Sequence, residues 1–434
     1  MLIRRLVITA IATITAGCSS THSLMPTPSS WQKIQSDLPF RDTPAARRKP
    51  PIDLLYITDR QPQTDSQEGL PYGEGRSYSL AFGAAAVEMG PDLSWLELER
   101  QSRLAQRTRG VNLNLGETKE LGRFPPIPYQ LQTTPSGIVR TAQVMDDHRK
   151  TRTRFETELR RRLEQSPSKD VVLYVHGFNE TFASAAYTSA ELCHFFGRRD
   201  VCAFFTWPAS STGFLLRSFT TTTESAKFSV GNLKRTIRMI AQTPGVDRLH
   251  LLAHSRGSAV LLDATRELVI EAVAAGIEPA RAFRIENLIV LAPDVDADVA
   301  RTSIGPFISD PDQMTRWRPK ELPRMVQGRI TIYTSPEDRA LILSTRLFRS
   351  RTRVGNLSAG DLAARSAEHL ATRGNVDFVV VKGRRTDFFG HSYFLSNPEV
   401  SSDLIQLVRF GTKPGEPGRP LRRLGPVSWA VPDG

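Results

Sequence analysis

The strongest constraint on the fold is an alternation of apolar runs and helix-length stretches that begins near Asp170. The apolar runs are the length of strands, and they span Val171–Val175, Val201–Thr206, Leu249–Ala253, Leu288–Ala292, Ile330–Tyr333 and Val376–Val381. The stretches with helical character span Thr181–Phe196, Val230–Gln242, Gly257–Ala275 and Ser402–Arg409. This alternation predicts an α/β fold with a mostly parallel central sheet and helices on both faces.

The sequence before this alternation predicts an antiparallel N-terminal extension of the same sheet. Residues 52–57 and 78–87 have the composition of strands, and a Gly-rich turn region separates them. Residues 145–165 are highly charged and place apolar side chains four residues apart, which is typical of an amphipathic helix. The whole chain has 434 residues, 40% of them hydrophobic, so we expect a sizeable core.

Both ends of the chain have compositions that predict segments outside the core. Residues 18–50 are rich in Ser, Thr, Pro and Arg without any period, which is typical of a linker. Residues 413–434 are rich in proline and predict a tail. Between them we expect one domain at 51–412, consisting of the N-terminal extension (51–165) and a core (166–412) that carries the chemistry.

The first 17 residues have the features of a bacterial secretion signal. Two arginines precede an apolar run at 6–16, which is too short to span a membrane. The run ends in Thr-Ala-Gly-Cys at Cys18, which resembles the lipobox of bacterial lipoproteins. That resemblance implies palmitate-type acylation of Cys18 and a lipid-anchored envelope protein at the periplasmic or outer surface. A plain signal peptide cleaved elsewhere is the alternative, and the choice of inner or outer membrane stays open.

The net charge of +12 comes from lysines and arginines scattered along the chain. Such scatter suits a solvated surface near anionic lipid or polysaccharide, and no nucleic-acid recognition motif accompanies it, so we expect no nucleic-acid partner. Beyond Cys18, the cysteines are Cys193 and Cys202. In an oxidising compartment this pair is able to form a disulfide, and the sequence leaves that open.

The most specific local pattern surrounds Ser255. The apolar run from Leu249 enters a helix through Ala-His-Ser-Arg-Gly, which resembles the nucleophile elbow G-x-S-x-G with Ala253 in place of the first glycine. The elbow needs small residues beside the serine because the turn is very tight. The serine then lies at a helix N-terminus, where backbone dipoles favour negative charge that develops in a reaction.

A second loop is expected beside this elbow. The run 171–175 ends in His-Gly-Phe-Asn, and the glycine allows close backbone approach. In proteins with such an elbow, this loop supplies one backbone N–H of an oxyanion hole, and the residue after the nucleophile supplies another. The donors would here be Phe178 and Arg256. His176 itself is expected to pack or to form structural hydrogen bonds.

A nucleophilic serine also needs a base and a carboxylate. Of the eight histidines, His391 is the one that follows the last predicted strand, from where a loop reaches back over the elbow. The acid should lie between Ser255 and His391 in the chain, after a strand, and Asp338 and Asp294 both qualify. We choose Asp338 because the usual acid comes one strand later than Asp294. Asp294 remains the alternative acid, or it caps the next helix or braces the elbow.

With these residues in place, the chain resembles the α/β-hydrolase superfamily, and within it a bacterial branch of uncharacterised serine hydrolases. The resemblance rests on His-Gly-Phe-Asn, Ala-His-Ser-x-Gly, Ala-Pro-Asp and Gly-His-Ser-x-Tyr-like stretches, and it runs from about Asp53 to Gly411. It implies the α/β-hydrolase fold and acyl-transfer chemistry, but no settled substrate.

From this resemblance we expect a serine esterase, in which Ser255, His391 and Asp338 form a triad and the reaction passes through an acyl-enzyme. An amide is the less favoured substrate, and no metal or cofactor is expected. The partners would be an acyl ester, or another small molecule or lipid, and the membrane through the N-terminal lipid. The alternatives are an acyltransferase with the same triad and a lipid-anchored binding or scaffold protein with an inactive fold. Residues 211–229 and 298–323 are expected to form lids, and the oligomeric state stays open.

Overall fold

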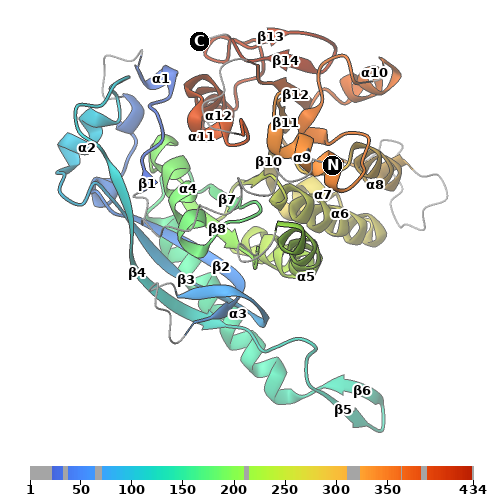
Figure 1. Cartoon of the computed structure of the whole chain (residues 1–434). Helices are drawn as coiled ribbons and strands as arrows, with labels where there is room; N and C mark the ends of the chain where they lie inside the picture. Colours follow the sequence, from blue (N-terminus) through green and yellow to red (C-terminus); the bar gives the residue numbers. More distant parts are fainter. Residues whose placement is uncertain are drawn as a thin grey trace, which may run out of the picture.

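A twelve-stranded sheet organises the molecule, with its strands in the order β1-β4-β3-β2-β8-β7-β9-β10-β11-β12-β14-β13 (Figure 1). The structure is a computed structural model that describes residues 22–32, 38–63, 71–209, 215–309, 323–362, 364–382 and 389–432. The strands are β1 (His22–Ser23), β2 (Ile52–Pro62), β3 (Tyr72–Met89), β4 (Asn112–Arg123), β7 (Val171–Val175), β8 (Val201–Thr206), β9 (Leu249–His254), β10 (Ile285–Leu291), β11 (Ile330–Thr334), β12 (Val376–Val380), β13 (Arg422–Arg423) and β14 (Ser428–Ala430).

The central part of this sheet is parallel, and its N-terminal part is antiparallel. The strands from β2 through β8, β7, β9, β10, β11 and β12 to β14 pair in parallel. β1, β4, β3 and β2 pair in antiparallel fashion, as does β13 with β14. The predicted parallel sheet with an antiparallel N-terminal extension is therefore confirmed. A separate hairpin of β5 (Leu131–Thr134) and β6 (Gly137–Arg140) projects from the body (Figure 1).

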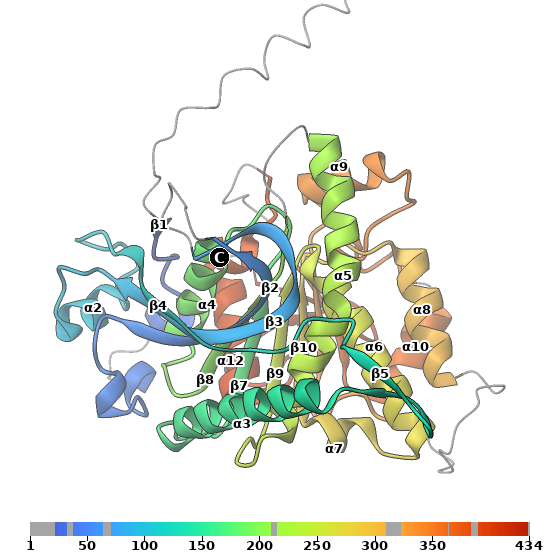
Figure 2. The same cartoon turned by 90° about the horizontal axis from the view of Figure 1, so that it is seen from below.

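Helices cover both faces of the sheet (Figures 1 and 2). The α-helices are α1 (Ser29–Gln32), α2 (Trp95–Gln101), α3 (Ala142–Glu164), α4 (Phe182–Phe195), α5 (Leu215–Gln242), α6 (Gly257–Ala275), α7 (Pro279–Phe283), α8 (Ala297–Ser309), α9 (Arg339–Leu347), α10 (Ala364–Arg373), α11 (Tyr393–Ser396) and α12 (Pro398–Phe410). The 3-10 turns are η1 (Leu38–Phe40), η2 (Ala45–Arg47) and η3 (Val354–Asn356).

Alternate side chains of the buried strands pack into two hydrophobic cores, one on each face of the sheet. Val172 and Tyr174 of β7 pack in the core covered by α4 and α12. Val171 and Leu173 of the same strand pack in the core covered by α3, α5 and α6. Burial on both faces explains why the parallel strands appear in the sequence as continuous apolar runs.

The predicted linker and the predicted tail are corrected by the structure. Within 18–50, Leu24 and Trp31 are buried in the core beside α4 and α12. In the tail, β14 extends the sheet, and the fully buried Arg419 forms a bidentate ion pair with Asp403. Both predictions failed because these segments are fixed mainly by individual side chains and hydrogen bonds, which leave no hydrophobic period in the sequence. None of the helices in the described ranges is both long and apolar enough to cross a membrane.

Candidate active site

Ser255 lies in a sharp turn between β9 and α6. Its φ of +52° is in the left-handed region, where a residue other than glycine is strained. The Ser255 N–H donates to the carbonyl oxygen of Leu291 at 2.9 Å, which ties the turn to the end of β10. A Cβ at Gly257 would lie 2.1 Å from the carbonyl oxygen of His176, so only glycine fits there. The structure therefore has the geometry of the predicted elbow.

The loop after β7 passes directly against this turn. A Cβ at Gly177 would lie 2.9 Å from the Ser255 Cβ, so glycine is what lets the two backbones approach. The Gly177 N–H donates to the Glu180 carboxylate at 3.0 Å, which commits that N–H to a structural role. The predicted oxyanion donors lie on either side of this contact. Phe178 is the next residue in the loop, and Arg256 is the N-cap of α6.

His391 and Asp338 are held together after β12 and β11, respectively. The His391 Nδ1 donates to the Asp338 Oδ2 at 2.6 Å, since a carboxylate oxygen only accepts. A neutral imidazole with a proton on Nδ1 presents Nε2 as the acceptor, which is the form that a general base requires. Asp338 is fully buried, and its other oxygen accepts from the Leu341 N–H at the start of α9. Its orientation is thus fixed from two sides.

Asp294, the alternative acid, does not contact His391. Its carboxylate lies 2.9 Å from the Arg256 guanidinium and 3.3 Å from that of Arg353, and it accepts from the Ser344 hydroxyl at 2.7 Å. Its backbone N–H donates to the Ser255 carbonyl oxygen at 3.1 Å. Asp294 therefore braces the elbow, which is one of the roles expected for it.

His176 has a structural environment. Its Nε2 accepts from the Trp207 backbone N–H at 3.1 Å, its carbonyl oxygen accepts from the Trp207 indole, and the two rings are stacked. Burial and the charge of Arg60 lower the pKa of His176 to about 4, so the ring is neutral at physiological pH.

Two residues at the site were not assigned a role from the sequence. His254 precedes the nucleophile, and its ring centroid lies 4.7 Å from that of His391. Glu180 closes the loop after β7 and lies 3.7 Å from the His254 ring nitrogen. Their positions directly before the serine and directly after His-Gly-Phe-Asn were the only sequence signals available.

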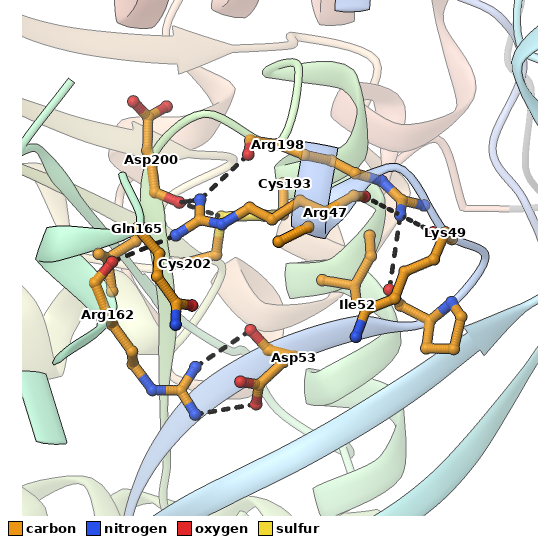
Figure 3. A pocket seen from close by; sticks show the side chains of 13 residues that line it. Arg47, Lys49, Ile52, Asp53, Arg162, Gln165, Cys193, Arg198, Asp200 and Cys202 are labelled. Carbon is orange, nitrogen blue, oxygen red and sulfur yellow. Dashed lines mark hydrogen bonds and ion pairs between the residues drawn. A yellow bond between two sulfur atoms is a disulfide. The ribbon is translucent and has the colours of Figure 1, made fainter. Parts of the chain in front are cut away.

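The site lies at the carboxyl edge of the parallel strands, where β7, β9, β11 and β12 end. A separate pocket lies at the opposite edge, and Figure 3 shows the side chains that line it. This cavity of about 90 Å³ is lined by the first residues of β2 and β8, by residues that precede these strands, including Arg47 and Arg198, and by the ends of α3 and α4. Cys193 and Cys202 also line it and form a disulfide, which answers the question that the sequence left open. None of the described residues forms a group of three or more His, Cys, Asp or Glu side chains able to hold a metal ion.

Several predictions fall wholly or partly outside the described residues. These are the signal sequence at 1–17, Cys18, and the parts of the expected lids at 211–214 and 310–322. The described part of the first lid is the start of α5, and that of the second includes α8.

A family model described as "Alpha/beta hydrolase of unknown function (DUF900)" matches residues 151–409. No curated protein matches the chain. Among solved structures, a lipase-esterase related protein from Clostridium acetobutylicum is 10% identical, with a TM-score of 0.29 over 55% of this chain and 93% of that one. An esterase from Pyrobaculum calidifontis is 13% identical, with a TM-score of 0.27 over 55% and 76% of the two chains. Carboxylesterase CesB from Bacillus subtilis is 12% identical, with a TM-score of 0.25 over 59% and 99%. These TM-scores are too low to support any argument.

Proposed function

This chain belongs to a family of α/β-hydrolases of unknown function, and from that membership we propose that it is a serine hydrolase that cleaves an ester. The nucleophile is Ser255, the general base is His391, and Asp338 orients the base. The substrate is an acyl ester in preference to an amide, an assignment that rests on fold-level analogy with esterases.

The reaction has two stages. The Ser255 Oγ attacks the carbonyl carbon while the His391 Nε2 takes the hydroxyl proton, and the backbone N–H groups of Phe178 and Arg256 hold the oxyanion. The same histidine then protonates the departing alcohol and leaves an acyl group on Ser255. In the second stage a water molecule attacks the acyl carbon while His391 takes a proton from it. The bond to the Ser255 Oγ then breaks, His391 returns the proton to that oxygen, and the acid leaves.

The observation that carries this proposal is the 2.6 Å hydrogen bond between His391 and the buried Asp338. The centroid of the His391 ring lies 4.7 Å from that of His254, the residue just before Ser255 in its strained turn. A carboxylate that fixes the Nδ1–H tautomer serves catalysis in a way that a structural histidine would not need. The glycine contacts at Gly177 and Gly257 support it further, because they bring the oxyanion loop against the nucleophile.

The test uses a fluorophosphonate probe, which reacts with activated serines. We expect the wild-type protein without residues 1–18 to be labelled, and Ser255→Ala and His391→Ala variants to remain unlabelled. A folded wild-type protein that resists the probe would contradict the hydrolase mechanism and favour a binding or scaffold protein. If labelling succeeds, product analysis with and without added alcohol separates hydrolysis from acyl transfer to another acceptor.

We also propose that the protein is held at a bacterial membrane by acylation of Cys18. Only three residues lie between Cys18 and His22 in β1, so the four residue steps of an extended chain would place the lipid within about 14 Å of the sheet. The domain would then lie directly at the bilayer surface. Metabolic labelling with an alkyne palmitate analogue should mark the full chain but not a Cys18→Ala variant, and equal labelling of the two would contradict the anchor.

A further inference from the structure

We infer that Glu180 and His254 are positioning residues that lock the loops of the nucleophile, the base and the oxyanion donor into one unit. This inference rests on the proposed function, because it concerns how that site is held for catalysis. Neither residue attacks the substrate or carries a proton in the mechanism above. Their contacts instead connect three segments that leave different strands of the sheet.

The first connection joins the turn at Ser255 to the loop that carries the base, residues 389–392, here called the base loop. The His254 Nε2 lies 3.3 Å from the backbone carbonyl oxygen of His391, and because a carbonyl only accepts, the imidazole must donate. The ring also packs against the ring of Phe394, with centroids 4.9 Å apart. Since His254 immediately precedes Ser255, this hydrogen bond helps to set the distance between nucleophile and base.

Two further hydrogen bonds join the base loop to the start of α9. The Arg339 N–H donates to the Phe389 carbonyl oxygen at 2.9 Å, and Asp338 accepts from the His391 ring. These contacts fix the base relative to its acid. Among the hydrogen bonds found in the described ranges, the His254 contact is the one that joins this loop to the turn of the nucleophile.

The second connection joins His254 to the oxyanion loop. The His254 Nδ1 lies 3.7 Å from the Glu180 Oε1, and the same oxygen accepts from the Gly177 N–H at 3.0 Å. The Glu180 carbonyl oxygen in turn accepts from the buried guanidinium of Arg60, which anchors the loop to β2. Glu180 therefore holds the backbone just before Phe178, and its carboxylate lies against the ring of His254.

The electrostatic environment fits a neutral ring beside a charged carboxylate. Burial lowers the pKa of His254 below its usual value. Burial raises the pKa of Glu180, but its contact with His254 and the hydrogen bond from the Gly177 N–H lower the pKa by more, so the carboxyl stays ionised. At neutral pH the imidazole is then the Nε2–H tautomer that the His391 carbonyl requires.

The experiment compares His254→Leu, His254→Gln and Glu180→Gln, with His369→Leu as the matched control on the exposed face of α10. The probes are the fluorophosphonate and p-nitrophenyl butyrate. His254→Leu should lower the labelling rate and kcat by about a hundredfold with KM nearly unchanged, because misplacement of a catalytic group by about 1 Å has that effect. His254→Gln keeps a donor near the Nε2 position, and its kcat should be about tenfold higher than that of His254→Leu.

Glu180→Gln keeps the acceptor for Gly177 but removes the charge, and it should lower kcat by about tenfold. Folding of each variant is checked by circular dichroism and by its melting temperature. A folded His254→Leu protein with wild-type kcat, or a His254→Gln protein no better than His254→Leu, would overturn the positioning role. Failure of the wild-type protein itself to react would instead overturn the proposed function, so the two outcomes are distinguishable.

Discussion

The two edges of the parallel sheet are built in different ways. At the carboxyl edge, segments that follow β7, β9, β11 and β12 bring together the residues proposed for catalysis, and close glycine contacts and single hydrogen bonds hold them there. At the amino edge, arginine side chains hold the backbone of an N-terminal strap, residues 38–51, against the core (Figure 3).

Arg47 and Arg198 make the central contacts at the amino edge. The Arg47 guanidinium donates to the carbonyl oxygens of Arg198 and Asp200, at 3.0 and 2.6 Å. Arg198 in turn donates to the carbonyl oxygens of Lys49 and Pro50. Burial lowers the pKa of Arg198 to about 9, so the side chain remains charged at neutral pH.

From this comparison we expect one edge to determine activity and the other to determine stability. The carboxyl edge contains strained backbone at Ser255, which is typical of a functional site. The amino edge contains a buried cation satisfied by carbonyl oxygens and a disulfide beside it. Substitutions at the first edge should therefore change rates, and those at the second should change the free energy of unfolding.

The largest expected effect is that of Asp338→Asn. Asparagine caps α9 as well as aspartate does, so the melting temperature should change little. The His391 ring would lose its tautomer control, and the fluorophosphonate labelling rate should fall by about 10⁴-fold. A large fall in melting temperature, measured by thermal denaturation, would contradict the expectation that substitutions at the carboxyl edge change rates and not stability.

The next effect is expected at the amino edge, for Arg198→Met. Several buried carbonyl oxygens would lose their donor, which should lower the free energy of unfolding by about 3 kcal/mol while the labelling rate of the folded protein stays the same. Arg199→Met is the matched control. Its ion pairs with Asp42 and Asp200 are long, at 3.9 and 3.8 Å, and should contribute less than about 1 kcal/mol. Urea denaturation measures both, and equal losses would contradict a special role for Arg198.

A smaller effect should follow from removing the disulfide with Cys193→Ala and Cys202→Ala together. The two cysteines are nine residues apart, so the loss of loop constraint should lower the free energy of unfolding by about 2.5 kcal/mol. Limited proteolysis should then cut the N-terminal strap faster, because the turn that holds it is no longer closed. Unchanged proteolysis would show that the arginine contacts hold the strap alone.

The smallest effect is a pH dependence of the free energy of unfolding, which we assign to Asp59 at the carboxyl edge. Burial raises the pKa of Asp59 to about 6, above the value near 4 of an unfolded chain. The folded state therefore binds more protons than the unfolded state between these values, and the stability associated with Asp59 falls as pH rises from about 4 to 6. Asp59→Asn should remove this component. The melting temperature of the variant should therefore rise relative to that of the wild type as the pH increases from 5 to 8. A constant difference between the two proteins would contradict it.

Much of the carboxyl edge was predictable from the sequence. The runs at 171–175 and 201–206 are β7 and β8 as predicted, and the match to residues 151–409 confirms the α/β-hydrolase fold. The elbow was recognisable because the tight turn restricts its neighbours to small residues. The position of His391 followed from chain order in the fold that the sequence resembles.

The amino edge was not predictable in the same way. Residues 22–50 have the composition of a linker, and nothing in them shows that Trp31 is buried or that Arg47 donates to the turn before β8. The long strand β4 was also missed, because its side chains alternate between buried and exposed positions only irregularly. Hydrogen bonds from single arginines to distant carbonyl oxygens have no periodicity that a sequence pattern could display.

The sequence by itself therefore determined the parallel sheet, the turn at Ser255 and the candidate base, because each of these depends on local residue order. Only the tertiary structure placed Asp338, and not Asp294, against His391, paired Cys193 with Cys202, and placed Glu180 against His254. The physical reason is that these choices depend on distances between residues far apart in the chain. Such distances are set by how the strands and helices pack, and not by the local sequence.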